Sequence, residues 1–170
     1  MIVEALLLTL ASYTVEPGDV LVRPVAGASV NVVRLPAATR ATPQGGMVLG
    51  LDIDWSWDGA WSLAAAVRPV LSPNYLDGSI GIGAKYRLVQ LNAPFLPYAS
   101  LLATTALGGP LGAGDLHVNG GARLAGGVDY FVMRNLAIGL EMAAEVSYLF
   151  TPIARPEASS EILVGVTWRL

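Results

Sequence analysis

Two pairs of carboxylates are the first residues of this chain whose types and spacing could do chemistry. Asp52 and Asp54 stand two positions apart, and Glu141 and Glu145 stand four positions apart. In an extended strand both spacings place the two side chains on one face. Such a pair could share the roles of general acid and general base. Ion pairing with Arg and Lys of other strands is the simpler explanation, and it is the one that we favour.

His117 is the only histidine, and Asn119 shares its face of an extended strand. A histidine base needs a nucleophile within hydrogen-bond reach, and no serine stands close to His117 in the sequence. The serines that only the fold could bring to it are Ser29, Ser62, Ser100 and Ser147. We therefore expect no catalytic residue, and we expect His117 to be structural or solvated.

The composition excludes several classes of protein. The chain has no cysteine, which rules out disulfides and thiolate metal sites, and we expect neither a metal nor a cofactor. The net charge of −3 gives no electrostatic footprint for nucleic acid. The glycine-rich stretches lack the Lys-Ser/Thr pair of a phosphate-binding loop.

The hydrophobicity of the chain is too high for an ordinary soluble surface. Charged residues make up 14% of its 170 residues and hydrophobic residues 54%, with a mean hydropathy of +0.55, whereas a soluble domain has about 25% charged residues. No apolar run reaches the ~18 residues that a transmembrane helix needs. Apolar residues that alternate along the strands of a membrane β-barrel fit both observations.

The hairpin at 122–148 carries the clearest alternation. One face of its second strand holds Leu136, Ile138, Leu140, Met142, Ala144, Val146 and Tyr148. The other face holds small residues with Glu141 and Glu145. A period of two indicates a strand, because a helix would mix the two sets.

The same alternation predicts an all-β fold, a closed antiparallel up-and-down transmembrane β-barrel of about eight strands. The predicted strands cover 20–34, 47–57, 61–68, 80–88, 98–106, 117–132, 136–148 and 162–170. Pro24 predicts that the first strand begins after it or carries a bulge, and the faces of 98–106 stay unassigned. Long loops are expected at 36–45, 72–79, 107–116 and 151–160, alternating with short turns.

We divide the chain into an N-terminal segment, 1–16, and a barrel domain, 17–170. The run from Ala5 to Ala11 is typical of a secretory signal, but Glu4 stands where a basic region is expected. A remnant of a signal peptide and an ordinary apolar segment both remain open.

Aromatic residues gather at the end of the predicted barrel that carries the short turns. Amphipathic rings favour membrane–water interfaces. The predicted interface set is Trp55, Trp57, Trp61, Tyr86, Tyr98, Tyr130 and Trp168.

The polar faces of the strands would point into the lumen, which a barrel of about eight strands fills with side chains. Five acidic and five basic residues share these faces: Asp52, Asp54, Asp129, Glu141 and Glu145, with Arg68, Lys85, Arg87, Arg123 and Arg169. A balanced set predicts an ion-pair network rather than a selective pore.

The second half of the chain resembles a known family. The stretches 126–131 and 136–141, with the C-terminal strand that ends in Trp168-Arg169-Leu170, resemble small bacterial outer-membrane β-barrels of the OmpA/OmpX-like superfamily. Leu170 departs from the terminal phenylalanine of that pattern. The resemblance implies a barrel in the bacterial outer membrane and says little about its activity.

We expect a structural or surface-interaction role. The expected partners are membrane lipids, with a surface protein or a peptidoglycan-associated partner left open, and no nucleic acid. Three alternatives remain. One is a membrane-embedded enzyme that modifies lipid A or another lipid, with His117 as base; outer-membrane barrels of this kind use a His and a Ser close in sequence. The others are a narrow channel and a soluble β-sandwich or lipocalin-like carrier.

Overall fold

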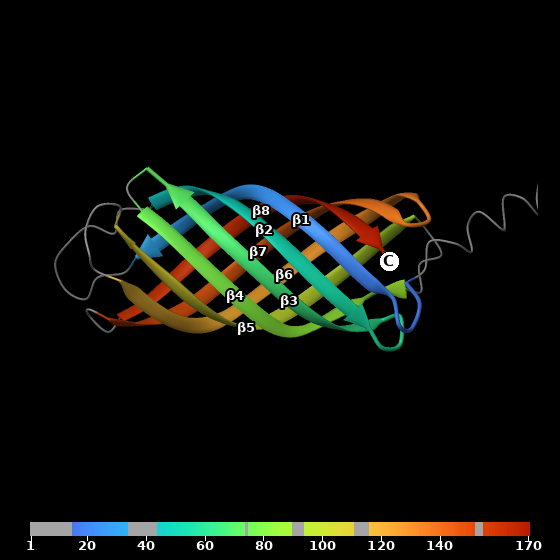
Figure 1. The fold of residues 1–170 in the computed structure, drawn as a ribbon, viewed down its shortest axis with the longest axis horizontal. Coiled ribbons are helices and arrows are strands. Elements are labelled where there is room, and N and C mark those ends of the chain that lie inside the picture. The colour runs from blue at the N-terminus through green and yellow to red at the C-terminus, as the bar shows by residue number, and fades with distance from the viewer. Residues whose placement is uncertain (1–14, 34–43, 74, 90–93, 111–115, 152–154) are drawn as a thin grey trace, which may run out of the picture.

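Eight antiparallel strands close into a barrel in chain order (Figure 1). The structure, a computed structural model, describes residues 15–33, 44–73, 75–89, 94–110, 116–151 and 155–170. The strands are β1 (Val20–Val33), β2 (Gln44–Ser56), β3 (Trp61–Ser72), β4 (Tyr75–Arg87), β5 (Phe95–Pro110), β6 (His117–Met133), β7 (Leu136–Thr151) and β8 (Arg155–Arg169).

The first and last strands close the barrel. Val22 pairs with Trp168 and Val25 with Gly165, so β1 and β8 run antiparallel like every other pair of neighbours. The predicted fold, a closed up-and-down barrel, is therefore confirmed. Among the described residues, no helix is long and apolar enough to cross a membrane.

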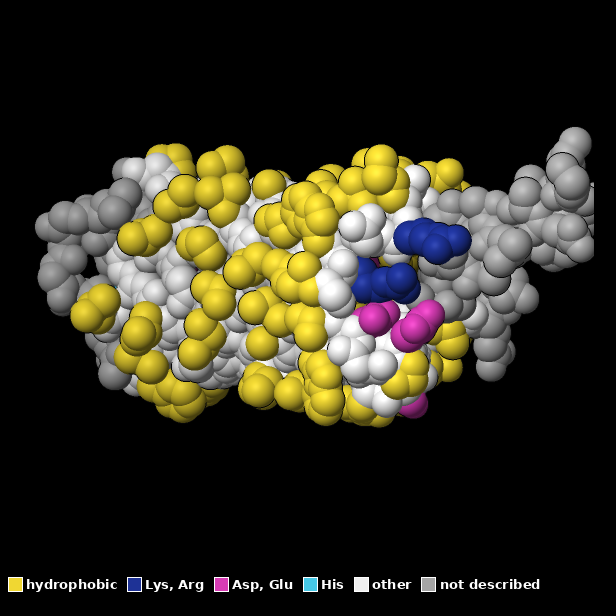
Figure 2. Space-filling model, turned by 45° about the vertical axis from the view of Figure 1, so that its right-hand side comes forward, with side chains coloured by type: hydrophobic (Ala, Val, Ile, Leu, Met, Phe, Trp, Pro, Cys, Tyr) yellow, Lys and Arg dark blue, Asp and Glu magenta, His cyan; other side chains and the backbone are white. Residues whose placement is uncertain are grey.

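Side chains alternate along the strands as in a membrane β-barrel, with apolar side chains outside and polar side chains inside. On β7, Ile138 is 50% exposed and points outward, whereas Glu141 is 2% exposed and points into the lumen. Figure 2 shows hydrophobic side chains spread over the wall of the barrel, with charged side chains at one end. A soluble carrier would bury its apolar face and expose its charged one, so this arrangement contradicts that alternative.

We call the two ends of the barrel the turn end and the loop end. The turn end carries the connections 57–60, 88–94 and 134–135 together with the C-terminal Leu170. The loop end carries the connections 34–43, 73–74, 111–116 and 152–154.

Three of the four predicted long loops, 72–79, 107–116 and 151–160, are shorter in the structure, whereas the connection 34–43 is as long as the predicted 36–45. β4 already begins at Tyr75, β5 continues to Pro110, and β8 begins at Arg155. The connections after β3 and β7 are only 73–74 and 152–154, shorter than 88–94 at the turn end. The polar and glycine-rich residues in these segments suggested loops. The hydrogen bonds between strands, however, are made by backbone groups, so any residue except proline can donate to a neighbouring strand.

Pro24 also differs from its prediction. It lies inside β1, paired with Leu51 of β2, and the register with β8 is the same before and after it. The strand therefore neither starts after Pro24 nor carries a bulge there. The predicted segment 1–16 lies outside the described residues up to position 14, and its role as a signal remnant stays a prediction.

Candidate functional site

Glu141 lies at the centre of the charged lumen. Its two oxygens face three arginines from three other strands: Arg123 Nη2 at 2.7 Å, Arg23 Nη1 at 2.9 Å and Arg68 Nη2 at 3.6 Å. The Tyr98 hydroxyl donates a further hydrogen bond of 2.7 Å to Glu141 Oε2 and also contacts Arg23. One carboxylate thus connects β1, β3, β5 and β6 to β7.

A second cluster surrounds Asp54, nearer the turn end. Asp54 Oδ2 lies 2.6 Å from Lys85 Nζ and 2.6 Å from Arg87 Nη2. Arg87 also contacts the Ser62 hydroxyl. Asp52, on the same face of β2, pairs with Arg68 and so belongs to the cluster around Glu141.

The network continues toward the loop end through Arg123. Its Nη2 lies 2.9 Å from Glu161 Oε2 on β8, as well as 2.7 Å from Glu141. Beyond it, the Thr104 hydroxyl donates a 2.8 Å hydrogen bond to Glu145 Oε1. Polar contacts therefore cross the lumen from β5, β6 and β7 to β8.

Inward glycines provide the room for these long side chains. A Cβ on Gly127 would lie 2.5 Å from the Tyr98 hydroxyl, and one on Gly165 would lie 2.5 Å from Arg23 Nε. A Cβ on Gly50 would lie 2.8 Å from Arg68 Nη1. These three glycines are thus positions where a neighbouring strand's side chain passes close to the backbone.

The burial of these charges is nearly complete. Arg87 is 0% exposed, Arg23 1% and Glu141 2%. Charges removed from water are costly unless they are paired and hydrogen-bonded. The contacts above give each of these three side chains an oppositely charged partner, while Arg23 Nε, Arg23 Nη2 and Arg87 Nε have no hydrogen-bond partner.

The structure places most of the predicted lumen residues together. Those that are buried inside the barrel are Asp52, Asp54, Arg68, Lys85, Arg87, Arg123, Asp129 and Glu141. Asp129 faces the Thr167 hydroxyl at 3.5 Å. Glu145 is half-buried toward the loop end. Arg169 differs, because it lies partly exposed at the turn end, where its Nη1 is 3.6 Å from Asp19 Oδ2.

Six of the predicted interface aromatics lie on the outside near the turn end: Trp55, Trp57, Trp61, Tyr86, Tyr130 and Trp168. Trp61 packs against Trp57 at 6.5 Å and Tyr86 at 4.8 Å between ring centroids. Tyr98 is a correction: it is 5% exposed and lies inside the lumen. The prediction failed because both faces of its strand mix apolar and polar residues.

Three members of the network were not predicted. Arg23 was missed because Pro24 obscured the parity of its strand, although Leu21, Arg23 and Val25 do alternate with outward residues. Glu161 was assigned next to a loop, and Tyr98 to the interface. The parity of β8 alone could have found Glu161, since it shares a face with Leu163 and Gly165.

A cluster of apolar side chains packs inside the barrel at the turn end. The buried cluster consists of Val15, Leu21, Leu96, Phe131 and Ala137, with Val89 packed against it. The segment before β1 is held there by backbone hydrogen bonds, because Gly18 N donates to Ser56 O at 2.7 Å and Ser56 N donates to Asp19 O at 2.9 Å.

The candidate catalytic residues do not all lie together. His117 begins β6 at the loop end, where it pairs with Gly108 and is half-buried. Ser29 and Ser147 lie toward the same end. Ser62 lies at the turn end, bonded to Arg87, and Ser100 lines the middle of the lumen. Among the described residues, no group of three His, Cys, Asp or Glu could hold a metal ion.

No family model matches the sequence, and no curated protein matches it either. The fold is similar to that of Neisserial surface protein A, with a TM-score of 0.73, 17% identity, and coverage of 90% of this chain and 99% of that one. It is also similar to the outer membrane protein OprG from Pseudomonas aeruginosa, with a TM-score of 0.64, 11% identity, and coverage of 93% and 98%.

A third similar structure is the N-terminal β-barrel domain of Pseudomonas aeruginosa OprF, with a TM-score of 0.64 and 13% identity over 91% of this chain and 98% of that one. At sequence identities this low, the similarity concerns the fold alone. The predicted resemblance to small outer-membrane β-barrels is confirmed at that level.

Proposed function

We propose that this chain is a bacterial outer-membrane β-barrel with a structural or surface-interaction role, and that ion pairs close its lumen. The observation that carries the proposal is Glu141, which joins Arg23, Arg68 and Arg123 across the middle of the barrel. A continuous water path would have to break these contacts.

The outward face supports the membrane location. Large apolar side chains such as Leu101, Leu124 and Met142 are each about 60% exposed, and contact with lipid tails removes them from water. The compared structures share this fold, and one of them, OprG, is named as an outer membrane protein. Both facts support the same location for this chain.

A closed lumen supports a role other than transport. The ion pairs fill the middle, and the apolar cluster around Leu21 and Phe131 fills the turn end. Among the described residues these are two groups of contacts at different depths of the lumen, and a conducting path would have to pass both. The surface role draws support from similarity to a protein named for the Neisserial surface, and the partner-facing part would be the loop end.

The test is conductance of the folded full-length chain in planar lipid bilayers. We expect no stable unitary conductance from the native chain. Conductance should also stay absent for Glu141→Ala, because the apolar cluster at the turn end still closes the lumen. A stable, ion-selective conductance of the native chain would contradict the proposal and favour the narrow channel.

A further inference from the structure

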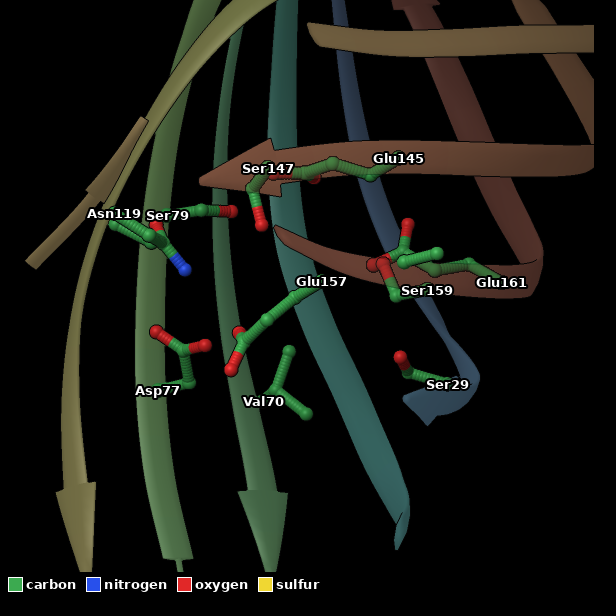
Figure 3. A pocket seen from close by; sticks show the side chains of 12 residues that line it. Ser29, Val70, Asp77, Ser79, Asn119, Glu145, Ser147, Glu157, Ser159 and Glu161 are labelled. Atoms are coloured by element: carbon green, nitrogen blue, oxygen red, sulfur yellow. The ribbon is translucent and has the colours of Figure 1, made fainter. Parts of the chain in front are cut away.

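The sequence Val-Arg-Pro-Val occurs twice, at 22–25 in β1 and at 67–70 in β3. Both copies have the same orientation in the wall. Arg23 is 1% and Arg68 3% exposed, so both point into the lumen, and the proline after each faces outward. Val70, two positions after Arg68, again points inward, toward a small cavity inside the loop end (Figure 3).

The proline of the first copy interrupts the ladder between β1 and β8. Leu170, directly after β8, donates from its backbone N to Val20 O at 2.9 Å, so the backbone groups of Val20 face β8. Backbone groups along a strand alternate between its two neighbours, and those of Pro24, four positions on, therefore also face β8. Proline has no N–H to donate. The ladder of β1 and β8 accordingly has no pair at Pro24 or at the residue before it.

The proline of the second copy interrupts the ladder between β2 and β3 in the same way. Trp57 N donates to Trp61 O at 3.1 Å, so the backbone groups of Trp61 face β2. Those of Pro69, eight positions on, face β2 as well. This ladder has no pair at Arg68 or Pro69, whereas the ladder between β3 and β4 continues through both.

The two interruptions flank β1 and β2, which are firmly joined to each other. The ladder between these two strands is continuous from Val20 to Asn31 of β1. Pro24 pairs there with Leu51, and the register of β2 and β3 places Pro69 opposite Leu49. The interruptions therefore lie at about the same height in the wall. Because lipid offers no hydrogen-bond donor, each of them is a weak point.

The arginine of each motif makes a contact inside the lumen across the interrupted ladder beside it. Arg23 passes over Gly165 of β8, where a Cβ would lie 2.5 Å from Arg23 Nε, and its Nη1 lies 2.9 Å from Glu141 Oε2 on β7. Arg68 pairs with Asp52 of β2. Side-chain contacts thus connect the strands where the prolines remove backbone contacts.

Further contacts in the lumen connect the β1–β2 pair to its neighbours. Asp54 of β2 lies 2.6 Å from both Lys85 Nζ and Arg87 Nη2 on β4, across β3. The last valines of the two motifs belong to one apolar cluster over four neighbouring strands, made by Val25, Val48, Leu163 and Val70. The β1–β2 pair is therefore held in the wall largely through the lumen.

We propose that the β1–β2 pair is a movable section of the wall, which separates from β8 and β3 as a unit and is held closed by Arg23 and Arg68. Opening breaks two ladders that already lack a bond at the level of the prolines, and it leaves the β1–β2 ladder intact. Such movement is additional to the proposed structural role, because it opens the wall sideways and needs no conducting lumen.

The test is residue-resolved amide hydrogen exchange, measured by NMR on the full-length chain folded in detergent micelles. On β1, the amides of Ala26 and Ala28 face β8, and those of Val25 and Gly27 face β2. We expect the first two to exchange about tenfold faster or more, because only they are freed when the pair separates. β5 is the internal control: both of its ladders are continuous, so its two sets of amides should exchange alike.

Two variants change the movement in opposite directions. Pro24→Val restores the donor toward β8 and should slow exchange of the β8-facing amides about tenfold, the effect of one hydrogen bond of ordinary strength. Arg23→Met removes the contact across the same ladder and should speed their exchange by about as much. The matched control is Pro97→Val, because the backbone of Pro97 faces Leu88, outside the ladder of β4 and β5. It should leave exchange on β1 unchanged.

Equal exchange of the two sets of β1 amides in the native chain would overturn the proposal. So would an equal effect of either variant on both sets, which would mean a general change of stability. Arg23→Met leaves Glu141 paired with Arg123, so we expect it to fold, and heat-modifiable migration on gels checks this. If it did not fold, the native chain and Pro24→Val would still decide between a movable section and a rigid wall.

Discussion

The Tyr98 hydroxyl on β5 donates a 2.7 Å hydrogen bond to Glu141 on β7, across the strand that lies between them. In the register of the sheet, Tyr98 pairs with Gly127 of β6, and Gly127 pairs with Glu141. The bond passes over Gly127 because that residue has no side chain to block it. A glycine on the middle strand thus allows the two outer strands to be joined inside the lumen.

Gly127→Ala tests this relationship. The new Cβ would lie 2.5 Å from the Tyr98 hydroxyl and 2.6 Å from Leu140 O, so the tyrosine must move. We expect the free energy of unfolding in detergent to fall by about 1–3 kcal/mol, the usual cost of overpacking. The control is Gly126→Ala, where the nearest atom, Tyr98 O, is 3.9 Å away and no loss is expected. Equal losses would show that the crossing is not the cause.

Glu141→Gln tests the network itself. The change keeps the size of the side chain but leaves Arg23, Arg68 and Arg123 without their shared charge. Breaking a buried ion pair costs about 3–5 kcal/mol, and we expect a loss of that order in urea unfolding in detergent. Glu16→Gln, an exposed position, should change stability by about 0.5 kcal/mol or less. If the two variants were equally stable, the network would not stabilise the barrel.

The outward face can be tested with a matched pair of methionines. Met142 and Met133 are 62% and 61% exposed, but Met142 lies within β7 and Met133 ends β6 at the turn end. In a bilayer, Met142→Arg should cost about 2–4 kcal/mol and Met133→Arg about 0–1 kcal/mol, because the cost of an arginine depends on depth. Reversible unfolding from lipid vesicles measures both. Equal costs would contradict the predicted position of the membrane.

The sequence predicted the fold where the strand parity is clean. On 136–148 every second residue is apolar, and those residues are the ones that the structure places outside. The same parity placed Glu141 and Asp54 in the lumen. A period of two is a direct consequence of strand geometry, so it can be read without knowing the neighbours.

The parts that could not be predicted depend on neighbouring strands. The partners of Glu141 come from β1, β3, β5 and β6, and no local pattern tells which arginine reaches it. The long loops were overestimated for the same reason, since Tyr75 and Arg155 belong to strands only because β3 and β7 offer them backbone partners. Tyr98 has an interface side chain by type, but its position on β5 points it into the lumen, where Gly127 opposite leaves room for it.

The four tryptophans provide the most direct test of the central claim, that the apolar face meets lipid. Trp55, Trp57, Trp61 and Trp168 are all 43–51% exposed on the outer wall near the turn end. With the chain folded into vesicles, bromines placed near the lipid headgroups should quench tryptophan fluorescence more than bromines placed near the bilayer centre. A chain that stays monomeric in water, with tryptophan emission unaffected by brominated lipid, would contradict the account.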